Sequence, residues 1–366
     1  MGSFAARAVC ACSLLVALAA GCGHKVPVRP VAATPTGPPE DEILYQKGLE
    51  AFHLATPEGY DQAAAAFRRA SQLKASNCGY AIHLAEALVF LAYEQRSNSE
   101  AFAPRLSEAT DILDRSEGNP ACSSLESAVD RMRGFSLYLS EPLRRTEGVA
   151  KVNKAIDLDP NDPLNWIVLS KLESRDPRNP IQKAVDLAPD QALVQYELGT
   201  SLLYVTDGFA RARLAFDRAL ELSPRHFESI IGKVYSFSED EYSDQTEPLL
   251  RKAVEIAPTF LTGRRLLGDY YAGLEETDKA VEQFRAAIGY NARYYPAFLS
   301  LGRTLLDAQR YDEAEQALTS LIQLDVTTPH PPQNAVDYTA DCQAHYFLGN
   351  VWLARRDLTK TKDEYQ

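Results

Sequence analysis

The sequence predicts an all-α fold, a solenoid of stacked helix–turn–helix repeats. Leu267-Gly268 returns as Leu301-Gly302, a shift of 34 residues (302 − 268). The small and apolar positions of the next segment keep this shift, since Ala280, Phe284 and Ala287 return as Ala314, Leu318 and Leu321. A period of 34 residues is typical of a two-helix unit that cannot bury its apolar face alone and stacks on copies of itself.

This pattern resembles the tetratricopeptide repeat, which sets Leu-Gly early in its first helix. The same family sets Ala, an aromatic residue and Ala on the second helix, often followed by Pro. The resemblance implies a right-handed superhelical solenoid whose concave groove binds a protein or a peptide. Residues 41–366 would hold about nine repeats, clearest over 190–326, with the last one incomplete.

The first three units follow from helix breakers and helical spacing. In unit one, the segment 56–59 (Thr-Pro-Glu-Gly) separates two helices, and Ala63, Phe67 and Ala70 form a stripe at i, i+4, i+7 on the second. Units two and three show a weaker pattern, so divergent repeats and a plain helical bundle both remain open there. Their expected helix pairs are 80–93 with 101–113 and 125–139 with 148–158.

The later units carry local departures from the period. Unit four begins at Pro163, and its second helix is confined between Pro180 and Pro189, which predicts a kink. Units five and six centre on Leu198-Gly199 and Ile231-Gly232, the latter with a long acidic turn over 238–244. A Pro-rich loop is expected over 327–336. Leu348-Gly349 then opens a ninth unit that lacks a capping helix, which suggests frayed ends, a covering subunit or a longer gene product.

The first residues read as a targeting segment. Residues 1–21 combine Arg7 with an uncharged apolar run at 8–20, too short to span a bilayer but suited to a signal peptide. The small residues before Cys22 resemble the lipobox of bacterial lipoproteins. That resemblance implies acylation of Cys22 and a lipid anchor in the cell envelope, facing the periplasm from the outer membrane. An ordinary secretory peptide and a buried helix are the alternatives. Residues 22–40 are Pro-rich and read as a semi-rigid tether.

Charge and motifs exclude several function classes. The net charge is −12 and Lys and Arg form no block, so a nucleic acid partner is not expected. The sequence contains none of the glycine-rich, zinc-binding or nucleophile-elbow motifs of common enzymes. Cys342 and His345 lie one helical turn apart, but two ligands make a weak metal site. We therefore expect no enzyme activity, no cofactor, no metal and no small-molecule substrate.

Two cysteines form a candidate disulfide. Cys78 and Cys122 each precede the first helix of adjacent expected units. Equivalent positions of stacked repeats lie close together, and export would permit the bond, although a disulfide needs Cα atoms within about 7 Å.

The concave groove supplies the candidate partner-binding residues. In the family, fixed positions of the first helix face the groove, and aromatic and Arg side chains there suit protein recognition. Counted from the Leu-Gly pairs, these positions hold Tyr196, Tyr204, His226, Phe237, Arg265, Asp269, Arg303, Asp307, Tyr346 and Asn350. The Lys and Asn clamp of chaperone-binding repeats is absent from them.

The sequence thus predicts a membrane-anchored scaffold or adaptor of the bacterial cell envelope that binds a protein or peptide. One alternative is a structural subunit that stacks on itself through its last repeat. Another is an accessory subunit of an envelope enzyme.

Overall fold

The computed structural model describes residues 38–94, 99–173, 178–237, 242–258, 260–327 and 335–365. The chain divides into two compact units, Met1–Pro38 and Pro39–Gln366, and the described helices all belong to the second. The predicted signal peptide, Cys22 and nearly all of the tether lie outside the described residues. Among the helices that the structure does describe, none is both long and apolar enough to cross a membrane.

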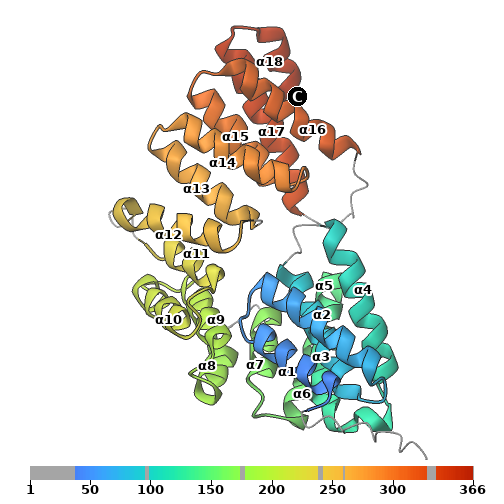
Figure 1. The fold of residues 1–366 in the computed structure, drawn as a ribbon. Helices are drawn as coiled ribbons and strands as arrows, with labels where there is room; N and C mark the ends of the chain where they lie inside the picture. Colours follow the sequence, from blue (N-terminus) through green and yellow to red (C-terminus); the bar gives the residue numbers. More distant parts are fainter. Residues whose placement is uncertain are drawn as a thin grey trace, which may run out of the picture. The chain divides into compact units, whose positions relative to one another are not determined.

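The described part of the second unit is helical and contains no strand (Figure 1). Its first half consists of α1 (Glu40–Phe52), α2 (Pro57–Leu73), α3 (Cys78–Glu94), α4 (Ser99–Ser116), η1 (Pro120–Leu125), α5 (Glu126–Ser140), η2 (Pro142–Arg144), α6 (Arg145–Leu158), α7 (Pro163–Leu172) and α8 (Arg178–Leu187). Its second half consists of α9 (Ala192–Leu202), α10 (Phe209–Leu222), α11 (Phe227–Tyr235), α12 (Tyr242–Ile256), α13 (Leu261–Gly273), α14 (Thr277–Tyr290), α15 (Tyr295–Asp307), α16 (Tyr311–Thr327), α17 (Ala335–Ala354) and α18 (Leu358–Tyr365).

The α-helices pack as successive pairs. Each odd-numbered helix contacts the even-numbered helix that follows it, from α1 with α2 to α17 with α18. Odd-numbered helices also contact the next odd-numbered one, as α3 does α5 and α13 does α15. We call the odd-numbered helices A helices and the even-numbered ones B helices. The A helices therefore share one side of the stack, and the predicted all-α fold is confirmed.

The Leu-Gly pairs are explained by a close contact between the two helices of one unit. A Cβ atom placed on Gly268 in α13 would lie 2.5 Å from the Phe284 ring of α14. One period later, a Cβ atom on Gly302 in α15 would lie 2.5 Å from Leu318 of α16. Both B-helix side chains are fully buried. The missing Cβ thus lets the second helix insert a large side chain against the backbone of the first.

The turn between an A helix and its B helix uses a left-handed residue in several units. Glu275 and Gln309 have φ values of 59°, and they are one 34-residue period apart. The equivalent turns of other described units place Ala55, Asp207 and Arg356 in the same region, with φ between 54° and 63°. A left-handed L residue costs about 1 kcal/mol. The tight reversal between the paired helices sets this requirement.

Three local expectations meet the structure differently. The short second helix of unit four is α8, but its partner α7 is equally short, 10 residues each. The acidic turn 238–244 is described only from Tyr242, where α12 begins. Most of the Pro-rich loop 327–336 lies outside the described residues, between the end of α16 and the start of α17.

Candidate binding surface

The predicted groove residues of units seven and eight come together on neighbouring A helices. Arg265 and Asp269 lie one turn apart on α13 and form an ion pair. Arg303 on α15 places Nη2 3.8 Å from Oδ1 of the same Asp269, and its side chain is 52% exposed. Asp307, one turn further along α15, is exposed. The result is a half-open cluster of two cations and two carboxylates, which we call the α13–α15 surface.

Burial and neighbouring charges act in opposite directions on Arg265. Burial would lower the pKa of its guanidinium, but Asp269, Tyr294 and Tyr235 outweigh this effect and raise the pKa. Arg265 therefore stays charged and fixed against α13. Arg303, by contrast, has a single long ion-pair contact and remains available to an external carboxylate. Tyr235, on α11, is 46% exposed and adds an aromatic edge.

Other predicted groove residues lie apart from this cluster. Tyr204 is 87% exposed, but it lies in the turn between α9 and α10. On α17, Tyr346 is 56% exposed, while the Asn350 side chain accepts a hydrogen bond of 2.7 Å from the Tyr365 hydroxyl. Two expectations need correction, because His226 and Phe237 are buried rather than presented on an open face. His226 caps α11, and the Phe237 ring packs under the Arg213 guanidinium at 5.0 Å.

A buried ion pair lies on the A helices of units four and five. Lys171 of α7 pairs with Glu197 of α9, and both side chains are less than one-tenth exposed. The Lys171 ammonium also lies 4.4 Å from the ring centre of Tyr93 on α3. Burial opposes the charge of Lys171, but Glu197 and Tyr93 outweigh it, so the pKa of Lys171 is raised. The sequence signal was available, since Lys171 is the one charged residue in the helix PLNWIVLSKL.

Next to it lies a carboxylate without a hydrogen bond. Glu228 of α11 is 6% exposed, and neither of its oxygens has a hydrogen-bond partner among the described residues. Its Oε2 lies 3.8 Å from Nδ1 of His226. Burial raises the pKa of Glu228, and the nearby Glu94 and Glu58 raise it further. Glu228 is therefore held in its neutral form, which sequence reasoning did not foresee.

His226 is held in the neutral form as well. Its Nδ1 accepts a hydrogen bond from the Ser229 amide (3.2 Å), and Tyr196 of α9 packs 5.0 Å from its ring. Burial lowers the pKa of His226 to about 4, and the backbone of Ala55 acts weakly in the opposite direction. The turn between α1 and α2 therefore lies against the start of α11.

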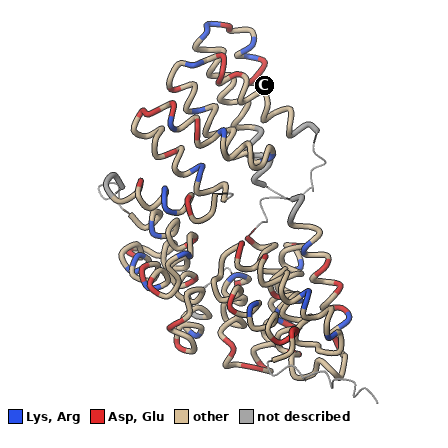
Figure 2. The backbone as a smooth tube through the Cα atoms, in the orientation of Figure 1, with Lys and Arg blue, Asp and Glu red and all other residues tan. Residues whose placement is uncertain are grey.

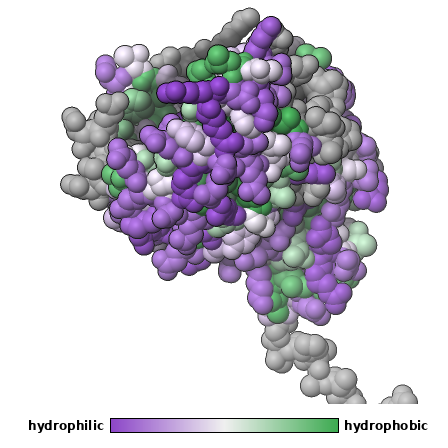
Figure 3. All heavy atoms as spheres, turned by 90° about the horizontal axis from the view of Figure 1, so that it is seen from above, coloured by the Kyte–Doolittle hydropathy of each residue, from purple (hydrophilic) through white to green (hydrophobic). Residues whose placement is uncertain are grey.

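Charge and hydropathy are mixed over the described chain. Figure 2 shows Lys and Arg interspersed with Asp and Glu along the A and B helices. The face drawn in Figure 3 is mostly hydrophilic, with smaller hydrophobic areas between the polar side chains. Recognition through matched charges is thus more in keeping with these surfaces than burial of one large apolar patch.

Comparison with known proteins agrees with the helix pairs. The tetratricopeptide repeat model matches residues 266–294, which cover parts of α13 and α14. The human IFIT1 dimer with m7Gppp-AAAA has a TM-score of 0.55 at 16% identity, covering 90% of this chain and 81% of that one. Yeast Tom70 has a TM-score of 0.52 at 13% identity, covering 88% and 90%. These likenesses show that the described part of the chain has the fold of an all-α repeat solenoid, and the tetratricopeptide repeat is matched over residues 266–294.

Curated relatives match over part of their length. Anaphase-promoting complex subunit 3 of Schizosaccharomyces pombe is 27% identical over 184 residues, which is 50% of this chain and 26% of that protein. Protein bimA of Emericella nidulans is 32% identical over 101 residues, 28% of this chain and 12% of that protein. The chain thus spans about a quarter of the first relative and less of the second.

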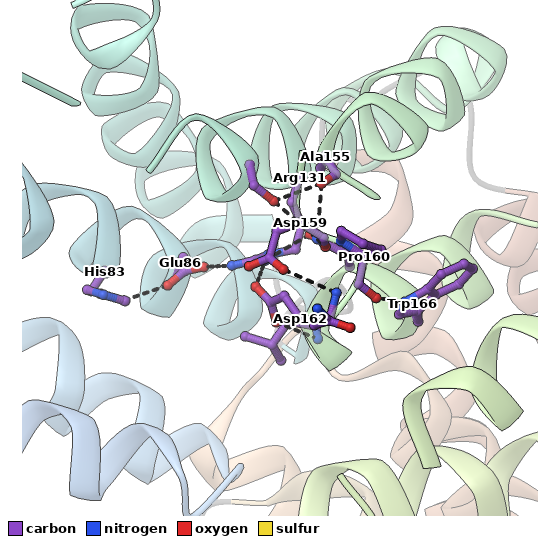
Figure 4. A network of polar contacts seen from close by, with 12 residues as sticks. His83, Glu86, Arg131, Ala155, Asp159, Pro160, Asp162 and Trp166 are labelled. Carbon is purple, nitrogen blue, oxygen red and sulfur yellow. Dashed lines mark hydrogen bonds and ion pairs between the residues drawn. The ribbon is translucent and has the colours of Figure 1, made fainter. Parts of the chain in front are cut away.

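In this all-α solenoid, a buried network fixes the A helices of units two to four. Arg131 of α5 is 2% exposed and donates to Glu86 of α3 and to Asp162, the N-cap of α7. It also donates to Asn165 Oδ1 at 2.9 Å. Figure 4 shows the contacts continuing from Glu86 to His83, with 2.7 Å between Oε2 and Nδ1. Three stacked A helices are thereby held in register by one guanidinium.

The two predicted cysteines meet at the edge of the same units. The structure joins Cys78 and Cys122 in a disulfide, with Cα atoms 5.5 Å apart. A cavity of about 560 Å³ lies beside the bond, between the C-terminal parts of α2 and α4. Cys342 is exposed. Nδ1 of His345 lies 2.6 Å from Oε2 of Glu364. Within the described ranges, no three metal-binding side chains gather at one point.

Proposed function

We propose that the chain is a protein-interaction scaffold that binds a protein or peptide segment across the α13–α15 surface. The observation that carries the proposal is the cluster of Arg265, Asp269 and Arg303 on adjacent A helices, with Arg303 half exposed. Paired charges of both signs suit a partner that presents a polar backbone and complementary side chains. The relatives support the scaffold class, since one of them is a subunit of the anaphase-promoting complex.

Charge argues against a nucleic acid partner in this proposal. The solved IFIT1 structure holds m7Gppp-AAAA, but this chain has a net charge of −12. A phosphate backbone is bound mainly through neutralising Lys and Arg side chains. We propose a protein partner and no catalytic role.

The experiment is a quantitative capture from membrane extracts with the full chain and a double variant, Arg265→Glu with Arg303→Glu. We expect proteins bound by the parent chain to be lost from the double variant. The matched control is Arg285→Glu on the B helix α14, whose side chain is 57% exposed, and it should retain them. Identical captures by all three proteins would contradict the proposal.

The proposed site of action is the bacterial cell envelope, with the solenoid anchored through acylated Cys22 and facing the periplasm from the outer membrane. The motif around Cys22 and the Pro-rich segment after it support this proposal. Replacing Cys22 by Ser should move the protein from the membrane to the aqueous fraction. An unchanged distribution would remove the anchor from the proposal.

A second candidate function is self-assembly through the last described repeat. It is favoured by exposed apolar side chains on α17 and α18, where Leu353, Leu358 and Tyr365 are 50%, 69% and 48% exposed. Light scattering coupled to size exclusion distinguishes the two functions. If the protein is a monomer at high concentration, self-assembly is ruled out and only the scaffold proposal remains.

A further inference from the structure

The turn of the first unit is buried where the equivalent turns of other units are exposed. Ala55 occupies the left-handed position of its turn and is 5% exposed. The residues at the same position in four other units, Asp207, Glu275, Gln309 and Arg356, are all exposed. Thr56, which follows Ala55, is 7% exposed. Something distant in the sequence therefore covers this turn.

Phe90 of α3 stacks on Tyr60 with the ring centres 5.4 Å apart, and charged groups of α3, α9 and α11 lie around the turn. The backbone of Ala55 acts on the buried ring of His226, at the start of α11. Burial raises the pKa of Tyr60, and Glu94 of α3, Glu228 of α11 and Glu197 of α9 raise it further. The first turn thus lies beside the N-terminal end of α11 and near charged groups of α9.

The turn offers no partner to one buried carboxyl group of α11. Lys171 is matched by Glu197, whereas within the part of the chain that the structure describes neither oxygen of Glu228 accepts a hydrogen bond. The covering turn, residues 54–59 (Leu-Ala-Thr-Pro-Glu-Gly), contains no cation and brings Glu58 towards Glu228 instead. A buried carboxyl group without hydrogen bonds is destabilising, because its lost contact with water is not replaced. The turn therefore fits the groove in shape better than in charge.

A Lys or Arg side chain would complete the same site. Its cation could donate to both oxygens of Glu228, a charge-assisted contact about twice as strong as a neutral one. The rings of Tyr60 and Tyr196 lie among the same charged groups, and aromatic faces attract cations. Charge complementarity thus identifies the chemistry of a partner that could compete with the turn.

We propose that the turn between α1 and α2 is an internal occupant of the α9–α11 groove, and that a partner segment displaces it by placing a Lys or Arg side chain against Glu228. The inference rests on the proposed scaffold function, but it concerns a different surface from Arg265 and Arg303. Binding at α9–α11 is then limited by the free energy needed to lift the first turn. The groove is self-inhibited until a basic segment arrives.

The probe is a displayed library of random short peptides, selected against the full chain and then against Glu228→Gln. We expect selected peptides to share one Lys or Arg, and their affinity for Glu228→Gln to fall about tenfold or more. Glu275→Gln, an exposed carboxylate of another turn, is the matched control and should leave affinity unchanged. The double variant at Arg265 and Arg303 should also leave it unchanged, which separates this inference from the proposed function.

A second variant tests displacement itself. Thr56 Oγ accepts a hydrogen bond of 3.0 Å from the Gly59 amide and caps α2. Thr56→Ala should loosen the turn and strengthen peptide binding several-fold, because less free energy is spent on lifting it. Hydrogen exchange over residues 52–60 should rise when peptide binds the parent chain. Selected peptides without a shared basic residue, full affinity for Glu228→Gln, or unchanged exchange at 52–60 would each overturn the proposal.

Discussion

The buried contact between Glu86 and Arg131 should dominate the acid stability of the first units. Burial alone would raise the pKa of Glu86, but Arg131 and His83 outweigh it and lower the pKa to about 2. A carboxyl whose pKa is lowered on folding stabilises the protein above its unfolded value, near 4.5, and loses that contribution as the pH falls towards 2. The change Glu86→Gln removes this titration and keeps the shape of the side chain.

Two magnitudes follow from the structure. At pH 7, the variant leaves the buried Arg131 without its main partner, and we expect a loss of roughly 3–5 kcal/mol in unfolding free energy. A pKa lowered from 4.5 to about 2 corresponds to roughly 3 kcal/mol of pH-dependent stability. Glu86 also raises the pKa of His83, so the comparison begins at pH 5, below that titration. From pH 5 to pH 3.5 the gap in unfolding free energy between parent and variant should narrow by roughly 1 kcal/mol, and further towards pH 2.

The assay is urea unfolding followed by the fluorescence of Trp166, which lies on α7 and donates to the Pro160 carbonyl at 2.9 Å. The chain has two tryptophans, so a Trp352→Phe background leaves Trp166 as the single reporter. Glu126→Gln, at a half-exposed ion pair with Lys154, is the control and should change stability by less than about 1 kcal/mol. A gap between parent and Glu86→Gln that stays constant down to pH 3.5 would refute the reasoning.

Three further predictions concern the other features of the solenoid. Replacing Cys78 and Cys122 by Ser opens a loop whose ends are 44 residues apart, so urea unfolding should show a loss of about 4 kcal/mol, whereas Cys342→Ser should show none. Gln309→Gly should raise the thermal midpoint through a gain of about 0.5–1 kcal/mol, because glycine relieves the left-handed backbone, and a drop would show that the turn is not strained. Opening of the first turn should be independent of pH between about 4.5 and 6.5. In that range the closed turn keeps a proton on Glu228, whose pKa is raised, and none on His226, whose pKa is lowered. The open turn keeps a proton on His226 and none on Glu228, so opening neither takes up nor releases a proton. Above pH 6.5, opening releases the Glu228 proton. Amide hydrogen exchange over residues 52–60, corrected for intrinsic rates, should then rise up to tenfold per pH unit. In the His226→Gln variant this rise should begin near pH 4.5.

The repeat fold was predictable because its decisive contacts are local. Gly268 and Phe284 belong to one unit, and each unit repeats the same contact, so a period in the sequence records it. The buried charges left a weaker local signal. A single Lys171 in an apolar helix indicates an internal partner but does not name Glu197, which lies on the next A helix. Pairing across units depends on the stacking geometry, which the period alone does not specify.

The contact between the first turn and α11 could not be read from the sequence at all. Ala55 and His226 are 171 residues apart (226 − 55), and no repeat pattern relates a turn to the start of a helix in another unit. Counting positions from the Leu-Gly pairs placed Tyr196 on an A helix and His226 at the start of one, but it could not show that His226 is covered. The burial of a groove position is set by distant segments.

This difference divides the A helices into two kinds of surface. On α3, α5 and α7, Glu86, Arg131 and Lys171 are buried and pair with charged groups of other units, and Glu228 of α11 is buried as well. On α13 and α15, Arg265 and Asp269 remain part-exposed, and Arg303 is open. A substitution in the first turn should therefore alter binding at α11, although no residue of α11 is changed. The same substitution should leave binding at Arg303 unchanged. Thr56→Ala separates the two surfaces, because a single cap holds the turn that covers one of them.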